Sequence, residues 1–151
     1  MLNVARTKAK AEKVIIRFLN MDAHKLDFKK DSFDIVISMR TFEFVDEYEE
    51  VLKEIFRVVK AKGKVLVGTV NKNSKLAQMY MNDYYQKYSI YRYANFKGKN
   101  DLILYKKEKL VDYKEYGFIP PDSKSEEINL EKEKEFSNTE PGGYMFVLWE
   151  K

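Results

Sequence analysis

Residues 31–70, DSFDIVISMRTFEFVDEYEEVLKEIFRVVKAKGKVLVGTV, decide the fold class of this chain. Residues 33–38 are apolar on both faces, which is typical of a strand buried in a parallel sheet. Residues 64–70 predict a second strand of the same kind. A helix with short connections joins them, and such units form parallel strand pairs with a right-handed crossover. The stretch therefore predicts part of a doubly wound α/β sheet.

The helix between these strands has the most regular pattern in the sequence. We predict that it covers about residues 46–60, with Asp46 as N-cap and Glu49 completing a capping box. Gly63 then supplies the left-handed residue expected at the helix end. The apolar residues recur at helical spacing and form one face, made of Tyr48, Val51, Leu52, Ile55, Phe56 and Val59.

Two further elements are predicted on the N-terminal side. An amphipathic helix is already formed at Met1 and has no capping residue before it. The β-branched run VIIRFL, residues 14–19, then predicts a strand.

On the C-terminal side, tyrosines dominate residues 76–93. Apolar residues four apart, at positions 76, 80, 84 and 88, indicate a helix whose aromatic stripe either packs on the sheet or covers a substrate pocket. A shorter helix is predicted over about 107–116, ended by Gly117. Residues 121–143 indicate a loop. Residues 144–149 predict a final strand, paired antiparallel at the edge of the sheet.

Composition excludes several classes of site. The 151 residues suit a single domain, and the chain has no cysteine and one histidine, so we expect no metal site. No segment resembles a signal peptide or a membrane span, which favours a cytoplasmic protein with no membrane partner. The net charge of +4 arises from 28 basic residues interleaved with 24 acidic ones. A nucleic-acid-binding domain more often clusters its basic residues on one face, so this mixture makes nucleic-acid binding the less favoured hypothesis.

Several short signatures resemble class I S-adenosylmethionine-dependent methyltransferases, of the type 11 kind. The segment DAHKLDF, residues 22–28, looks like the family's D-A-x-x-L-P-F, and SFDIVIS, residues 32–38, looks like its S-F-D-x-V-x-S strand. The segment EIFRVVKAKGK, residues 54–64, is similar to its E-x-x-R-V-L-K-P-G-G helix exit. The resemblance covers about residues 1–118. It implies a Rossmann-like doubly wound sheet, mostly parallel, with an antiparallel C-terminal strand.

The resemblance implies a cofactor site at the carboxyl ends of the strands. Asp22 would accept from the adenine amino group and the Ala23 backbone would donate to the ring, although an Asp at this place can equally cap the following turn. Ser38 and Met39 would lie near the methionine end of the cofactor. Candidate acceptor-binding residues are Arg40, Glu43 and Tyr84, and we name no catalytic residue. Since a sulfonium leaving group needs little acid–base help, the lack of an evident base does not oppose methyl transfer.

The family's first strand, Gly-rich turn and second strand have no counterpart here, because all six glycines lie at position 63 or later. We therefore interpret residues 1–151 as one N-terminally truncated methyltransferase-like domain. The alternatives are a second chain that supplies or replaces the missing strands, and a rearranged fold with another function. In the family's strand order the two missing strands would separate residues 14–19 from residues 33–38. Their loss predicts an exposed edge at 33–38 that favours self-association, and weak cofactor binding by the monomer.

Three functions remain open from the sequence. The first is S-adenosylmethionine-dependent methyl transfer to a small-molecule acceptor, by an enzyme of which this chain is a fragment with uncertain activity. The second is a non-catalytic binding or assembly partner. The third is an RNA-related role, supported only by the basic balance and the lysines at 97, 99, 106, 107 and 109.

Overall fold

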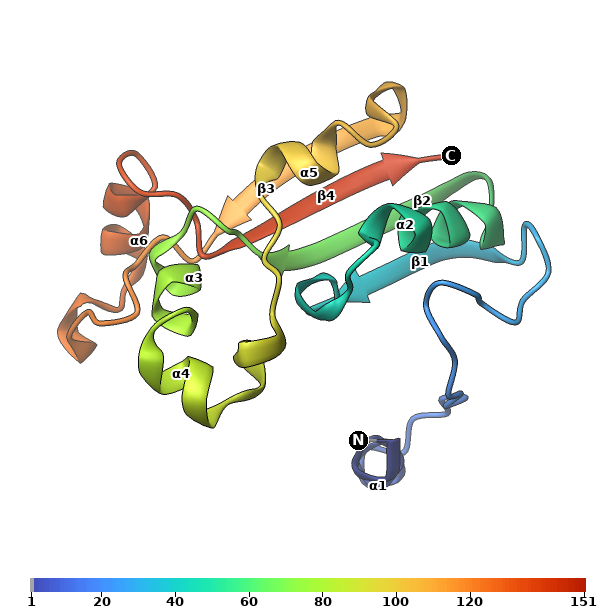
Figure 1. Cartoon of the computed structure of the whole chain (residues 1–151), viewed down its shortest axis with the longest axis horizontal. Coiled ribbons are helices and arrows are strands. Elements are labelled where there is room, and N and C mark those ends of the chain that lie inside the picture. The colour runs from blue at the N-terminus through green and yellow to red at the C-terminus, as the bar shows by residue number, and fades with distance from the viewer. Residues whose placement is uncertain (1) are drawn as a thin grey trace.

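A computed structural model describes residues 2–151 and contains a mixed four-stranded sheet in the order β1-β2-β4-β3 (Figure 1). The strands are β1 (Phe33–Met39), β2 (Val59–Val70), β3 (Leu110–Tyr116) and β4 (Tyr144–Glu150). β1 and β2 are parallel, whereas β4 runs antiparallel to both β2 and β3. The α/β class is thus confirmed, but the expected mostly parallel sheet is not, since one of these three pairings is parallel.

Helix α2 (Tyr48–Val58) joins β1 to β2, so the predicted strand–helix–strand unit is confirmed. Its ends differ from the prediction. Glu47 is the N-cap residue and makes no side-chain cap, so the capping box at Asp46 is wrong. The chain passes directly from α2 into β2, and Lys62 rather than Gly63 has the left-handed φ of 62°. Gly63 is required for space instead, because a Cβ there would lie 2.7 Å from the carbonyl oxygen of Asp34.

The main core lies between α2 and one face of the sheet. The apolar face of α2 packs on alternate residues of β2 and β4, as the helical and strand periods predict. Trp149 is fully buried there, and its indole nitrogen donates to the carbonyl oxygen of Tyr105 at 3.0 Å. Buried residues that α2, β2 and β4 contribute to this cluster include Leu52, Phe56, Val65, Val67, Met145, Val147 and Trp149.

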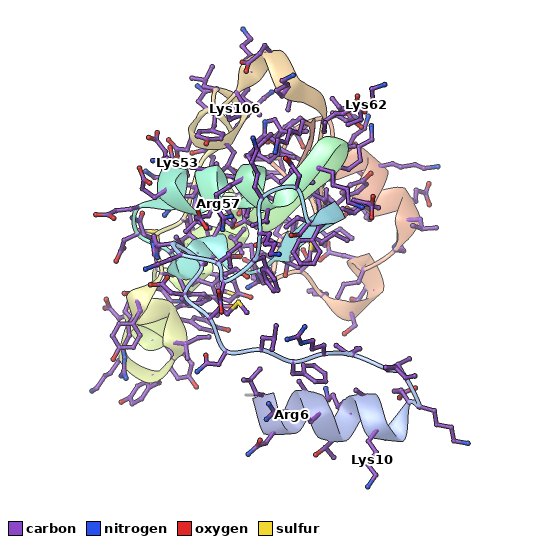
Figure 2. All side chains as sticks on the ribbon, turned by 90° about the vertical axis from the view of Figure 1, so that its right-hand side faces the viewer. Arg6, Lys10, Lys53, Arg57, Lys62 and Lys106 are labelled. Carbon is purple, nitrogen blue, oxygen red and sulfur yellow. The ribbon has the colours of Figure 1, made fainter. Side chains whose placement is uncertain are left out.

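The N-terminal region departs from the prediction. Helix α1 (Leu2–Ala11) forms, while its predicted start at Met1 lies outside the described residues. Residues 14–19 are extended but belong to no sheet, and Ile15 is fully exposed. Figure 2 shows α1 standing off from the body of the molecule. A β-branched sequence alone does not make a strand, because a strand is stabilised by pairing with a neighbour.

The tyrosine-rich segment forms two short helices rather than one. These are α3 (Lys75–Tyr80) and α4 (Asp83–Tyr88), followed by the 3-10 turn η2 (Ile90–Tyr93). The break occurs at Asn82, whose side chain accepts from the backbone N–H of Tyr85 at 3.1 Å and so starts a new helix. The segment lies beyond the carboxyl ends of β1 and β2 (Figure 1).

The C-terminal part contains the largest corrections. The predicted helix at 107–116 is the short 3-10 turn η3 (Lys107–Lys109) followed by strand β3. The pairing of β3 with β4 shifts register between Leu110 and Asp112. A bulge of this kind adds one residue, so Leu110 and Tyr113, three apart, both pack against the main core and imitate helical spacing.

Three other elements complete the C-terminal part. Helix α5 (Lys99–Ile103) precedes β3, while η4 (Ser125–Glu127) and α6 (Leu130–Phe136) occupy the segment predicted as a loop. Strand β4 is central, not at the edge, because β3 lies outside it. None of the helices in residues 2–151 has the length and apolar character needed to cross a membrane.

Candidate functional site

The carboxyl ends of the parallel strands β1 and β2 position a cluster of polar side chains. Arg40 follows β1 with a left-handed φ of 56°, and its backbone N–H donates to the carbonyl oxygen of Gly68 at 2.9 Å. A non-glycine residue in this conformation is strained and marks a place where the surrounding structure dictates the backbone. The turn directs the Arg40 side chain to the tyrosine segment rather than along the strand.

Glu43 is the centre of this cluster. It lies in the 3-10 turn η1 (Phe42–Phe44) and is fully buried. Its Oε1 accepts from the backbone N–H of Val70 at 2.9 Å and lies 2.8 Å from Nε of Arg40, while its backbone carbonyl accepts from Asn95 at 2.7 Å. One residue therefore ties the ends of β1 and β2 to the segment that follows the tyrosines. Its second carboxylate oxygen has no hydrogen-bond partner among the described residues.

Aromatic rings surround the Arg40 guanidinium. Its Nη2 donates to the hydroxyl of Tyr91 at 2.6 Å, and its central carbon lies 5.1 Å from the ring centroid of Tyr144. Tyr91 stacks on Tyr80 with 3.7 Å between centroids. Burial, together with the Tyr91 hydroxyl, raises the pKa of Tyr80. We refer to Arg40, Glu43, Tyr80 and Tyr91 as the Arg40 cluster. It presents a cation, phenol groups and a buried carboxylate at the strand ends.

Ser38 and Met39, predicted beside the cofactor, are consecutive in β1 and so point to opposite faces of the sheet. Met39 is half exposed and reaches over β2, where a Cβ at Gly68 would lie 2.7 Å from its sulfur. Gly68 thus leaves the space that Met39 fills. The placing of Ser38 and Met39 beside the cofactor stays a prediction.

Asp22 caps the turn that follows it, which the sequence analysis gave as the alternative to adenine binding. Its Oδ1 accepts from the backbone N–H of His24 at 2.9 Å and lies 2.8 Å from the His24 ring nitrogen Nδ1. These hydrogen bonds lower the pKa of Asp22. The carboxylate remains largely exposed, whereas Ala23 packs against the main core. Asp22 therefore caps its own turn and keeps Oδ2 without a hydrogen bond to other described residues.

A clamp on α2, which the sequence interpretation missed, holds residues 26–28. Arg57 donates to the carbonyl oxygens of Leu26 and Phe28, both at 2.8 Å, and also to Glu54. Glu54 in turn accepts from the backbone N–H of Leu26 at 3.0 Å. These hydrogen bonds lower the pKa of Glu54 to about 2. The signal was present as the E-x-x-R of residues 54–57, and its role here is to fix the segment after Asp22 (Figure 2 labels Arg57).

The comparisons with known proteins agree with this architecture. Residues 1–67 match the family model described as methyltransferase domain. The structure superimposes on a SAM-dependent methyltransferase of Thermotoga maritima with a TM-score of 0.68 and 25% identity, covering 95% of this chain and 67% of that one. The chain is thus similar to S-adenosylmethionine-dependent methyltransferases, in sequence over residues 1–67 and in fold over most of its length.

Two curated relatives are similar to parts of this chain. It is 31% identical over 108 residues to an uncharacterized protein of Methanocaldococcus jannaschii, covering 71% of this chain and 52% of that protein. It is 45% identical over 67 residues to a demethylmenaquinone methyltransferase of Lactococcus lactis, covering 44% of this chain and 27% of that enzyme. The chain thus spans about half, or less, of the length of these relatives.

The structure brings together only some of the residues predicted to bind the acceptor. Arg40 and Glu43 are in direct contact. Tyr84 is exposed and packs on Tyr85 and Tyr88. The sequence missed Tyr80 and Tyr91, which carry the contacts to Arg40, because a tyrosine-rich segment does not show which rings its helices turn inward.

One of the basic residues noted for an RNA-related role is a structural residue of the fold. Lys97 is buried, and its Nζ donates to the carbonyl oxygens of Val45 at 3.0 Å and Asn95 at 2.7 Å. Burial lowers its pKa. The residues described, 2–151, include no group of three or more His, Cys, Asp or Glu side chains suited to a metal ion.

Proposed function

We propose that the protein transfers a methyl group from S-adenosylmethionine to a small quinone-related acceptor, through an oxygen or a ring carbon. The observation that carries this proposal is the position of the Arg40 cluster. It lies at the carboxyl ends of parallel strands in a methyltransferase fold, where ligands of open α/β sheets bind. The likeness to a demethylmenaquinone methyltransferase supports the acceptor class.

Residues at this edge fit part of the cofactor. Asp22 offers an exposed carboxylate oxygen suited to an amino group, and the clamp from Glu54 and Arg57 keeps the following segment in place. Ser38 and Met39 end the strand that would pass beneath the methionine portion. When bound, the cofactor supplies an electrophilic methyl group on a positively charged sulfur.

The chain's own contribution is then to bind and orient the acceptor. The Arg40 guanidinium suits an oxygen that carries partial or full negative charge, such as a phenolate. The stacked rings of Tyr80 and Tyr91 suit a planar acceptor, because offset aromatic stacking adds to the burial of apolar area. Orienting the acceptor and excluding water are the main requirements of such a displacement.

The test is a calorimetric titration of the full chain with S-adenosylmethionine, followed by transfer of a labelled methyl group to a panel of hydroquinones. Asp22→Ala should weaken cofactor binding by about 1–3 kcal/mol, the cost of leaving a polar partner unpaired. His24→Ala is the matched control, because the backbone N–H that bonds Asp22 stays. Equal effects of the two substitutions would overturn the assignment of Asp22.

A further inference from the structure

A basic hollow lies at the opposite end of the sheet from the Arg40 cluster. It is formed between α2 and the turn η3, where β2 begins, whereas α3 and α4 lie at the other end of the sheet (Figure 1). Its volume of about 480 Å³ is in the range of sites that bind small molecules. Seven residues line it: Lys53, Phe56, Arg57, Tyr105, Lys106, Lys109 and Lys151. Five of these seven are basic and none is acidic.

Two elements direct their basic side chains into the basic hollow. Lys53 and Arg57 are four residues apart on α2 and so lie on one face of the helix, with Phe56 beside them. Lys106 and Lys109 are three apart at η3, where the backbone N–H of Lys109 donates to the carbonyl oxygen of Lys106 at 2.8 Å. Side chains three apart in a 3-10 turn eclipse one another. Figure 2 shows Lys53, Arg57 and Lys106 on the same side of the molecule.

Two of the five cations have no carboxylate partner. The other three form the ion pairs Lys53–Glu50, Arg57–Glu54 and Lys151–Asp31. Lys106 and Lys109 are exposed and form no ion pair with any residue in the described range 2–151. Their positive charge is therefore available to an anion that enters the basic hollow.

Aromatic rings form the floor of the basic hollow. Nζ of Lys106 lies 5.5 Å from the ring centroid of Phe56 and 5.8 Å from that of Tyr105. Lys106 has a left-handed φ of 46°, a conformation that the surrounding structure must hold in a non-glycine residue. The indole nitrogen of Trp149 donates to the carbonyl oxygen of Tyr105 and so anchors this segment to the core. Burial raises the pKa of Tyr105, so its hydroxyl stays protonated at neutral pH. The floor is thus neutral and fixed in place, with cations around it.

We propose that the basic hollow binds a nucleotide, with its phosphate on Lys106 and Lys109 and its planar base against the ring of Tyr105. Lysine binds phosphate groups as a point charge, and aromatic side chains stack on bases of any kind. The nucleotide is either free or part of an RNA strand, because both present the same phosphate and base. Of the lysines noted in the sequence for an RNA-related role, Lys97 is buried and structural, whereas these two lie together at the basic hollow.

The test is a calorimetric titration of the full chain with adenosine monophosphate at one fixed salt concentration, because affinity for phosphate falls as salt rises. Lys106→Gln and Lys109→Gln should each raise the dissociation constant about tenfold, the effect of losing a hydrogen bond to a charged group. Lys107→Gln is the matched control, because Lys107 belongs to the same turn but does not line the basic hollow. Ribose 5-phosphate should bind about tenfold more weakly than adenosine monophosphate, since it has no base to stack. Far-ultraviolet circular dichroism checks that each variant is folded.

Two further ligands show where the nucleotide binds and from which source it comes. S-adenosylmethionine should not displace adenosine monophosphate, so the result is independent of the proposed function. A short oligoadenylate that binds more tightly than the monophosphate, and that the same two substitutions weaken, would identify an RNA strand as the source. An oligoadenylate that binds no more tightly would identify a free nucleotide.

Four outcomes would overturn the proposal. The first is that neither adenosine monophosphate nor the oligoadenylate binds. The second is displacement of the monophosphate by S-adenosylmethionine, because this would place it at the candidate cofactor site. The third is equal dissociation constants for the wild type and a double variant with Lys106→Gln and Lys109→Gln. The fourth is equally tight binding of a polyglutamate peptide, which would indicate an acidic protein segment instead of a nucleotide.

Discussion

The side chains of Glu43 and Arg40 lie 2.8 Å apart, and the Glu43 carboxylate is fully buried while Arg40 remains about one-third exposed. Because Glu43 Oε1 also accepts from the backbone N–H of Val70, the pair connects the end of β1 to the end of β2. A buried carboxylate is tolerated only when it is paired and hydrogen-bonded. This relationship makes Glu43 a structural residue of the site as well as a neighbour of the proposed acceptor.

Glu43→Gln should lower the free energy of unfolding by about 1–3 kcal/mol. The amide oxygen still accepts from Val70, but the partly buried guanidinium of Arg40 loses its counter-charge. Urea denaturation measures the change. Glu47→Gln is the control, because Glu47 is exposed and makes no side-chain cap on α2. A loss of stability no larger than in this control would contradict the role given to Glu43.

The clamp predicts a dependence of stability on pH. Hydrogen bonds from Arg57 lower the pKa of Glu54 from 4.5 to about 2 in the folded chain. The stabilisation is therefore present above about pH 4.5 and is lost as the pH falls toward 2. Glu54→Gln should lower the free energy of unfolding by about 1–2 kcal/mol at pH 7. It should also make the free energy of unfolding less dependent on pH between pH 4.5 and 2.

Unfolding curves at several pH values between 2 and 7 measure this effect. Glu50→Gln is the matched control on the same helix, because its pair with Lys53 is exposed and such pairs contribute little. Parallel pH profiles for the wild type and Glu54→Gln would show that the clamp does not set the acid sensitivity.

Tyr91→Phe should separate the hydrogen bond to Arg40 from the ring stack. The substitution removes the hydroxyl that accepts from Nη2 and keeps the ring that packs on Tyr80. We expect a loss of about 1–2 kcal/mol in the free energy of unfolding, measured by urea denaturation. Tyr88→Phe should have no measurable effect, since Tyr88 is exposed and its hydroxyl has no bonded partner among the described residues. Identical curves for the two variants would refute the contact.

Lys97→Met should destabilise the fold by about 1–3 kcal/mol. The methionine occupies a similar volume, but the carbonyl oxygens of Val45 and Asn95 lose their donor. Thermal unfolding compares this variant with Lys107→Met, which changes an exposed lysine of the same C-terminal half. A larger effect at Lys107 would mean that Lys97 is not the structural lysine.

The sequence by itself determined the strand–helix–strand unit of residues 33–70 and the core face of α2. These features depend on periods of two and 3.6 residues, which can be read within a single element. It also placed Arg40 and Glu43 at the end of β1, because the residues that follow a buried strand must lie at its carboxyl edge. The two clamp residues stand in the sequence as E-x-x-R, residues 54–57, but the sequence did not indicate that they bind residues 26–28.

The tertiary structure alone decided the features that depend on a distant partner. Strand β3 forms because β4 lies beside it and pairs with it. Its bulge places core-facing residues three apart instead of two, so the sequence has the spacing of a helix rather than that of a strand. Residues 14–19 remain unpaired because no described strand lies beside them. Glu43 and Lys97 are buried because segments distant in the sequence pack around them. Such long-range packing produces no periodic pattern in the sequence, so it cannot be predicted from residue spacing.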